Sequence, residues 1–222
     1  MDRPIRAVIF DMDGVLVDSG AFHRRAWQTL LKEIGTPTTD PEFWRLTIGR
    51  SVEEALPLLV KRPLAPREIA RHARRKTDLY HEYARQGFAP VPGAPAFVRH
   101  LEAVRVPRAL ASSASRRSVH AVLKGLQLNQ SFGAVVTADD VRNGKPDPEV
   151  YLTAAQLIGV APEQCVVFED SEVGIQSAAS AGMRCIGVTT THTGAELKHA
   201  GAGRTVPDFN GLTWDEIVRP PR

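Results

Sequence analysis

Cysteine is scarce in this sequence: Cys165 and Cys185 are the only two, and each lies in a short apolar stretch. This pattern is typical of buried free thiols and not of a disulfide framework. Long apolar runs are also absent, since no stretch of about 18 apolar residues is present to cross a membrane. The N-terminus shows no signal-peptide pattern. We therefore expect a cytoplasmic protein with no membrane partner.

Neither sign of charge dominates, because the sequence has 28 lysines and arginines and 25 acidic residues, which give a formal net charge of +3. Such a mild basic excess can attract small anions, but the dense basic run of a nucleic-acid binder is missing. Arg71, Arg74, Arg75 and Lys76 fall at helical spacing, which predicts a solvated helix face. A chain of 222 residues suits one domain, with or without an insertion, and a monomer is the default expectation.

Short β-rich apolar runs alternate with helical patterns along most of the chain. The runs are Ala7 to Phe10, Arg108 to Ala111, Ala134 to Thr137, Cys165 to Phe168 and Cys185 to Val188. The helical patterns are Ser118 to Leu126, Pro148 to Ile158 and Ser171 to Ala181. This alternation predicts an α/β fold, a Rossmann-like parallel sheet with helices on both faces.

One long segment after the first strand contains only helical patterns. They are Phe22 to Ile34, Pro41 to Thr47, Ser51 to Val60 and Pro66 to Gln86. We interpret residues 18–87 as an inserted all-helical cap domain, and residues 1–17 with 88–222 as the core domain. Hinges are expected near Val17 to Ser19 and near Gly87 to Val91.

Polar residues follow four of the five predicted strands directly or within a short loop. They are Asp11 and Asp13; Ser112, Ser113 and Ser115; Lys145; and Glu169, Asp170 and Ser171. The carboxyl ends of parallel strands meet at one edge of a sheet, so we expect these side chains to gather there. Four clustered carboxylates need a cation, and oxygen ligands without a His/Cys cluster favour Mg²⁺ over zinc.

No GxGxxG or GxxxxGK[ST] motif follows the first strand, so nucleotide cradles of those kinds are not indicated. The remaining motifs resemble those of the haloacid dehalogenase-like superfamily over nearly the whole chain. "DMDGVLVDS" at residues 11–19 is similar to the first motif of that family, and Ser112 in "LASSAS" to the second. Lys145 in "GKPDP" is similar to the third motif, and "FEDSEVG" at residues 168–174 to the fourth.

The resemblance implies a role for each matching residue. Asp11 would be the nucleophile that becomes an aspartyl-phosphate, and Asp13 the general acid and then the general base. Ser112 would grip the transferring phosphoryl group, and Lys145 would bridge Asp11 and the phosphate. The metal Mg²⁺ would be held by Asp11, Asp170 and the main-chain carbonyl of Asp13, with Glu169 assisting directly or through water.

The helical insertion is similar to the small cap in the branch that contains β-phosphoglucomutase and many sugar-phosphate phosphatases. His23, Arg50 and Lys76 stand at positions that resemble substrate-facing positions of this branch, and ordinary packing or solvated roles remain open for each. Ser113 is a further candidate for substrate binding, or a turn residue. Trp27 and Trp44 are expected in the cap core, and Asp18 as an N-cap or hinge acid.

Three functions are therefore weighed. A second acid at Asp13 favours phosphate esters over dehalogenation or phosphonate cleavage within the resembling family. A Mg²⁺-dependent phosphatase of a small phosphorylated metabolite, such as a sugar phosphate, is the main expectation. A phosphomutase acting on a sugar 1-phosphate is the alternative, weakened because "GRSVEEAL" replaces the usual "SRxxSL" of the mutases. A non-catalytic module that binds a phosphorylated metabolite is the third.

Overall fold

The computed structural model describes residues 4–36, 41–85 and 87–218 of the chain. A six-stranded sheet in the order β5-β4-β1-β6-β7-β8 forms its centre, and every neighbouring pair in it is parallel. The strands are β1 Ala7–Phe10, β4 Arg108–Ala111, β5 Ala134–Val136, β6 Cys165–Glu169, β7 Arg184–Val188 and β8 Arg204–Val206. The sequence prediction of an α/β fold with a parallel sheet is confirmed.

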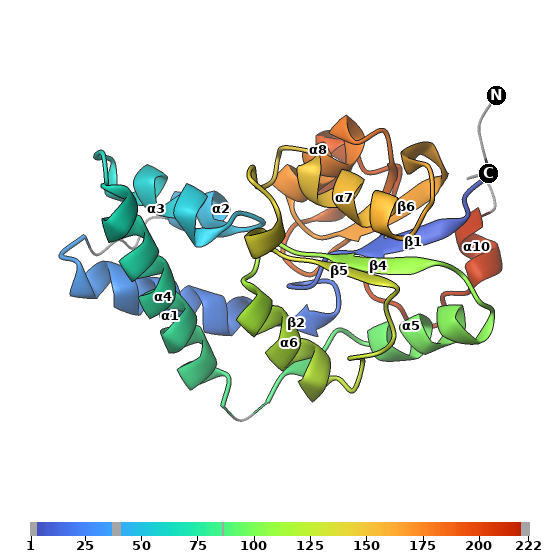
Figure 1. Cartoon of the computed structure of the whole chain (residues 1–222), viewed down its shortest axis with the longest axis horizontal. Coiled ribbons are helices and arrows are strands. Elements are labelled where there is room, and N and C mark those ends of the chain that lie inside the picture. Colours follow the sequence, from blue (N-terminus) through green and yellow to red (C-terminus); the bar gives the residue numbers. More distant parts are fainter. Residues whose placement is uncertain (1–3, 37–40, 86, 219–222) are drawn as a thin grey trace.

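Helices cover both faces of this sheet, which explains why its inner strands are almost continuously apolar. One face carries α5 Ala94–Ala103, α6 Arg116–Gly125 and α10 Trp214–Val218 (Figure 1). The other face carries α7 Glu149–Leu157, α8 Glu172–Ser180 and α9 Gly194–Ala200. Each layer has its own apolar core, so the sheet is held firmly and its edge can support a site.

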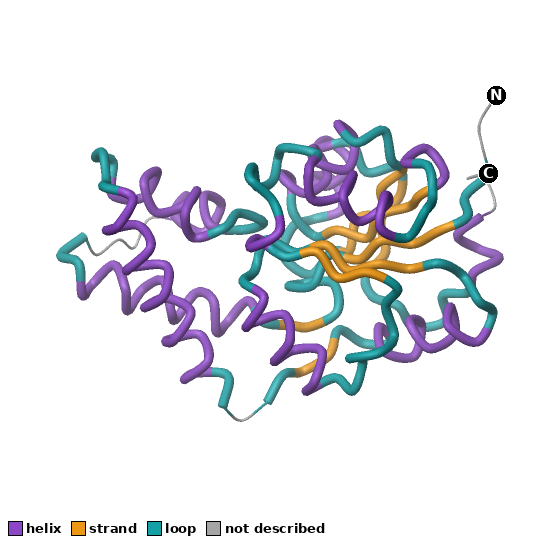
Figure 2. The backbone as a smooth tube through the Cα atoms, viewed as in Figure 1, coloured by secondary structure: helices purple, strands orange, loops and turns teal. Residues whose placement is uncertain are grey.

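The cap consists of α1 Gly20–Glu33, α2 Pro41–Thr47, α3 Val52–Val60 and α4 Pro66–Tyr83. A third apolar core, which includes Trp27, Leu30 and Tyr80, lies among these helices, and Trp44 packs against it. Figure 2 shows the cap helices set apart from the strands of the sheet. The expectation that both tryptophans belong to the cap core is confirmed.

A short antiparallel ribbon joins the cap to the core. Its strands are β2 Val17–Asp18 and β3 Ala89–Pro90, with Val17 opposite Pro90 and Asp18 opposite Ala89. Both segments that the sequence predicts as hinges contribute to this ribbon. The division into residues 18–87 and the remainder stays a prediction, and its first boundary falls inside β2.

Some sequence predictions differ from the structure. Strand β8 was not predicted, because three residues between turns are too few for a periodic pattern. Asp18 does not cap α1: it lies in β2, and Ser19 is the residue that precedes the helix. Lys76 is buried and not part of a solvated face.

Cys165 and Cys185 are buried free thiols, as expected. Within the described residues, every helix is too short or too polar to span a bilayer.

Candidate active site

The two central strands of the sheet place the first and fourth motifs side by side. Phe10 pairs with Phe168 where β1 and β6 run in parallel, and the backbone N–H of Asp11 donates to the carbonyl of Phe168 at 3.0 Å. Asp11 therefore leaves the sheet next to Glu169 and Asp170. Carboxylate oxygens of these three acids lie within 4.8 Å of one another. The sequence prediction that distant motifs meet at this edge agrees with the geometry.

Lys145 reaches this cluster from the loop before α7 and neutralises part of its charge. Its ammonium group donates to Asp11 Oδ1 at 2.6 Å and to Glu169 Oε1 at 2.8 Å. The Lys145 side chain is buried, and the negative charges of Asp11 and Glu169 outweigh that burial and raise the pKa of Lys145. The lysine is therefore a permanent cation between the two carboxylates.

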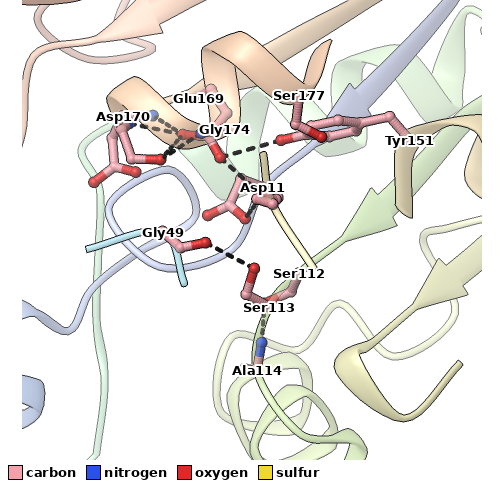
Figure 3. A network of polar contacts seen from close by, with 12 residues as sticks. Asp11, Gly49, Ser112, Ser113, Ala114, Tyr151, Glu169, Asp170, Gly174 and Ser177 are labelled. Atoms are coloured by element: carbon pink, nitrogen blue, oxygen red, sulfur yellow. Dashed lines mark hydrogen bonds and ion pairs between the residues drawn. The ribbon is translucent and has the colours of Figure 1, made fainter. Parts of the chain in front are cut away.

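Glu169 has both carboxylate oxygens occupied. Oε1 accepts from the hydroxyl of Tyr151 (Figure 3) and from Lys145. Oε2 accepts from the N–H groups of Asp170 and Ser171 and from Ser171 Oγ. A Cβ on Gly174 of α8 would overlap this carboxylate, so only glycine fits there. Direct metal binding by Glu169 stays a prediction, and its hydrogen bonds favour a role in holding Lys145 and the loop.

The cluster is short of positive charge. Burial and the charge of Glu169 raise the pKa of Asp11 to about 7, although Lys145 opposes them. Burial and the charges of Glu169 and Asp11 also raise the pKa of Asp170 well above its usual value. One ammonium group cannot balance three buried carboxylates, whereas a hard divalent cation bound by oxygen would. The residues present therefore fit a Mg²⁺ site.

Gly14 brings the first motif loop close enough to share that site. Its φ of +79° is in the left-handed region, and a Cβ at this position would overlap the carboxylate of Asp170. The hydroxyl of Thr190 donates to the carbonyl of Gly14 at 2.6 Å and fixes the loop. The backbone that follows Asp13 is therefore packed against Asp170, in agreement with a metal site made from both loops.

Asp13 faces the cap, unlike Asp11. Its Oδ1 accepts from Nε2 of His23 at 3.0 Å and from the hydroxyl of Ser19. Lys76 Nζ lies 2.5 Å from Nδ1 of His23. A charged lysine can only donate, so Nδ1 accepts its hydrogen bond and the proton of the imidazole resides on Nε2. Lys76, His23 and Asp13 thus form one chain of hydrogen bonds from cap to core.

The charges in this chain are set by its burial. Burial and the charge of Lys76 lower the pKa of His23, which keeps the imidazole neutral. Burial lowers the pKa of Lys76 to about 8. For Asp13, burial acts to raise the pKa, but His23, Ser19 and Lys76 together outweigh it and lower the value. Asp13 is therefore an anion at neutral pH, whereas Asp11 sits near the middle of its titration without a metal.

The cap closes over a cavity of about 380 Å³ that both parts of the chain line. The hydroxyl of Ser113 donates to the carbonyl of Gly49 in the cap at 2.8 Å (Figure 3). Arg117 of α6 pairs with Asp78 of α4 at 2.6 Å. These contacts hold the cap against the core, and the hydroxyl of Ser113 is used for that purpose. Substrate contact by Ser113 stays a prediction.

The remaining predicted residues also face the cavity. Ser112 is buried in its wall, and its Oγ accepts from the N–H of Ala114 at 3.1 Å. Arg50 lines the cap side, where its guanidinium makes a long 3.4 Å contact with the carbonyl of Leu46. His23 and Lys76 line the same cavity while forming the chain to Asp13. Every predicted site residue except Glu169 lines this one cavity, and Glu169 lies behind it, bonded to Lys145.

Sequence reasoning missed several residues at the site, and Thr191 and Tyr151 are the two that contact the acidic cluster. Thr191 donates to Asp170 Oδ2 at 2.6 Å, and Tyr151 contacts Glu169. Thr191 follows β7, so the rule about strand ends that identified the other motifs would have found it. Tyr151 carried no signal, because a tyrosine at helical spacing reads as a core residue.

Comparisons with known proteins agree with this geometry. Residues 5–182 match the family described as haloacid dehalogenase-like hydrolase. The validoxylamine A 7'-phosphate phosphatase of Streptomyces hygroscopicus subsp. limoneus is 34% identical over 220 residues, covering 96% of this chain and 98% of that protein. The β-phosphoglucomutase of Bacillus subtilis is 33% identical over 193 residues, covering 83% of each chain.

The solved structures include the same kinds of relative. The crystal structure of β-phosphoglucomutase from Clostridium difficile superposes with a TM-score of 0.85 at 28% identity. The match covers 96% of this chain and 95% of that one. Both a phosphatase and mutases are thus similar to this chain over most of its length, so overall similarity does not separate the two activities.

Proposed function

Because this chain belongs to the haloacid dehalogenase-like hydrolase family, we propose that it is a Mg²⁺-dependent phosphatase of a small phosphate monoester, a sugar phosphate or a related metabolite. One observation carries the proposal: two carboxylates on one loop have different surroundings. Asp11 pairs with Lys145 beside the acidic cluster, and Asp13 pairs with neutral His23 of the cap. Two acids kept in unlike environments are suited to unlike tasks.

The chemistry follows from these positions. A carboxylate oxygen of Asp11 attacks phosphorus, and the bond from phosphorus to the ester oxygen breaks. Asp13 is an anion in the free protein and must take up a proton before this step; it gives that proton to the leaving oxygen and then removes one from the water that hydrolyses the phospho-aspartate. Lys145 neutralises charge on Asp11 and on the phosphoryl oxygens, and Ser112 offers its hydroxyl from the cavity wall.

A metal would be held by the carboxylates of Asp11 and Asp170 and by the main-chain carbonyl of Asp13. Bound there, Mg²⁺ would offset the negative charge of the phosphoryl group. The chain itself limits the entry of bulk water, because the cap lies over the cavity and the contact of Ser113 with Gly49 holds it there. Phosphoryl transfer from the ester to Asp11 requires such an enclosure, and hydrolysis of the phospho-aspartate requires water to enter.

The charges on the cap side of the cavity favour a phosphatase over a mutase. A mutase must hold a second phosphate there, which needs cations that are free to bind it. The cap contributes Arg50 and Lys76 to the lining, but also Glu53 and Glu54, and Lys76 is already bonded to His23. This balance suits an uncharged, hydroxyl-rich leaving group better than a second dianion.

The first experiment measures Mg²⁺-dependent phosphate release from an aryl phosphate and from a panel of sugar phosphates. We expect turnover with Mg²⁺, loss with EDTA, and loss in Asp11→Asn. Glu172→Gln is the matched control, because this acid lies in the first turn of α8 and is not among the hydrogen-bond or ion-pair partners of Asp11 or Lys145. Full activity of Asp11→Asn would refute the assignment of the nucleophile.

A second experiment separates the alternatives. The enzyme is incubated with a sugar 1-phosphate and a catalytic amount of the corresponding bisphosphate. Free phosphate as the product supports the phosphatase, and sugar 6-phosphate identifies the mutase. Binding of phosphorylated metabolites without any turnover would instead identify the non-catalytic module.

A further inference from the structure

Tyr151 is a fully buried tyrosine on α7 that the proposed chemistry does not use. Its hydroxyl donates to Glu169 Oε1 at 3.1 Å (Figure 3). The ammonium nitrogen of Lys145 lies 4.8 Å from the centre of its ring. One side chain therefore contacts both the anion and the cation that stand behind Asp11.

The hydroxyl of Tyr151 meets the one oxygen of Glu169 that Lys145 also uses. The other oxygen, Oε2, is held by Asp170 and Ser171 and cannot turn toward the lysine. Lys145 and Tyr151 share the lone pairs and the negative charge of this one oxygen, so donation from Tyr151 weakens its attraction for Lys145. Without this bond, Oε1 would have Lys145 as its single donor.

Lys145 must divide three N–H donors among its acceptors. Two point to Asp11 Oδ1 and Glu169 Oε1, and the group lines the cavity where the phosphoryl oxygens would enter. A stronger hold by Glu169 would draw the ammonium group away from Asp11. The ring of Tyr151 adds a cation–π contact that supports the lysine from the side of α7.

We propose that Tyr151 is a positioning residue for phosphoryl transfer: it occupies Glu169 Oε1 so that Lys145 stays directed at Asp11 and the phosphoryl oxygens. This role rests on the proposed phosphatase function. It acts through Lys145 and Glu169 and requires no contact between Tyr151 and the substrate.

The test is Tyr151→Phe, which keeps the ring and removes only the hydroxyl. We expect kcat to fall about tenfold, the effect of one hydrogen bond to a charged group, with KM within about twofold of the wild type. Tyr83→Phe is the matched control, because Tyr83 bonds to Thr29 inside the cap and lies outside the cavity lining. We expect this control to keep the wild-type kcat.

A second readout needs no turnover. In the metal-free protein, the ammonium signal of Lys145 in a ¹H–¹⁵N spectrum is assigned by its loss in Lys145→Met. We expect Tyr151→Phe to move this signal downfield, as the bond to Glu169 strengthens, and Tyr83→Phe to leave it unchanged.

The two measurements separate the possible failures. An unmoved signal, or a moved signal with unchanged kcat, overturns the role of Tyr151. A wild-type enzyme without phosphatase activity refutes the proposed function instead, and the signal still tests the contact with Lys145.

Discussion

Asp11 gives the metal-free protein a distinctive dependence of stability on pH. Its pKa rises from an ordinary 3.8 to about 7 in the folded protein, chiefly through burial. Between these values the unfolded chain has released a proton that the folded protein still holds. Stability contributed by this group is therefore complete below about pH 4 and is lost as pH rises toward 7.

The size of this effect follows from the shift. A change of about 3 pKa units at about 1.36 kcal/mol each gives a loss of at most about 4 kcal/mol by pH 7. For a chain of this length that corresponds to a fall in Tm of about 10 °C. Mg²⁺ should restore the loss, because a bound cation removes the penalty of ionising Asp11 among buried acids.

The assay compares urea unfolding of the wild type and of Asp11→Asn in EDTA, at about pH 5 and about pH 7.5. His23 has a lowered pKa and so an opposite slope below about pH 6.5, but it is present in both proteins and cancels. We expect the unfolding free energy of the variant to rise relative to that of the wild type as pH rises, and Mg²⁺ to reduce that difference. A difference in unfolding free energy between the two proteins that is the same at both pH values would refute the raised pKa of Asp11.

Three further predictions concern the cap and the metal site. In Lys76→Met, loss of the lysine charge should raise the pKa of His23, which an NMR titration measures. An unchanged pKa would contradict the hydrogen bonds that link Lys76 through His23 to Asp13. Gly14→Ala should weaken Mg²⁺ binding about tenfold in calorimetry, because the new Cβ overlaps Asp170; an unaltered Kd would show that the loop adapts. Leu30→Ala should cost about 2–5 kcal/mol of unfolding free energy in urea, since Leu30 is fully buried in the cap core; a smaller loss would mean that the cavity collapses.

The fold could be predicted from the sequence because its strands and helices differ in period. The run Ala7 to Phe10 is short, apolar and followed by acids, which is enough to place it inside a parallel sheet. Strand β8 could not be found in the same way, since three residues offer no period to recognise. Helix starts were predicted to within a few residues where the sequence shows an N-cap residue, as at Ser171, whose Oγ accepts from the N–H of Gly174.

The site could be predicted as far as it depends on strand ends. Asp11 and Lys145 are 134 positions apart in sequence, and only the parallel sheet explains why they meet. The sequence did not indicate the contacts that side chains on helices make in the site. Lys76 stands in a basic stripe that suggests solvent, yet it turns inward to His23, and Tyr151 resembles an ordinary core residue. Such contacts depend on the rotation of each helix about its axis, which a local pattern fixes poorly.

The ribbon of β2 and β3 has a consequence for how new specificities can arise in this architecture. The chain leaves the core at Val17 and returns at Pro90, and these residues pair directly. The loop-closure cost of a segment inserted between these paired ends grows only with the logarithm of its length, by about 0.6 kcal/mol for each doubling. The cap can therefore be exchanged as a cassette, while the sheet that carries Asp11 and Lys145 keeps its strand order. Substrate range can then vary while the nucleophile keeps its place, although the surroundings of Asp13 change with the cap because His23 and Lys76 belong to it.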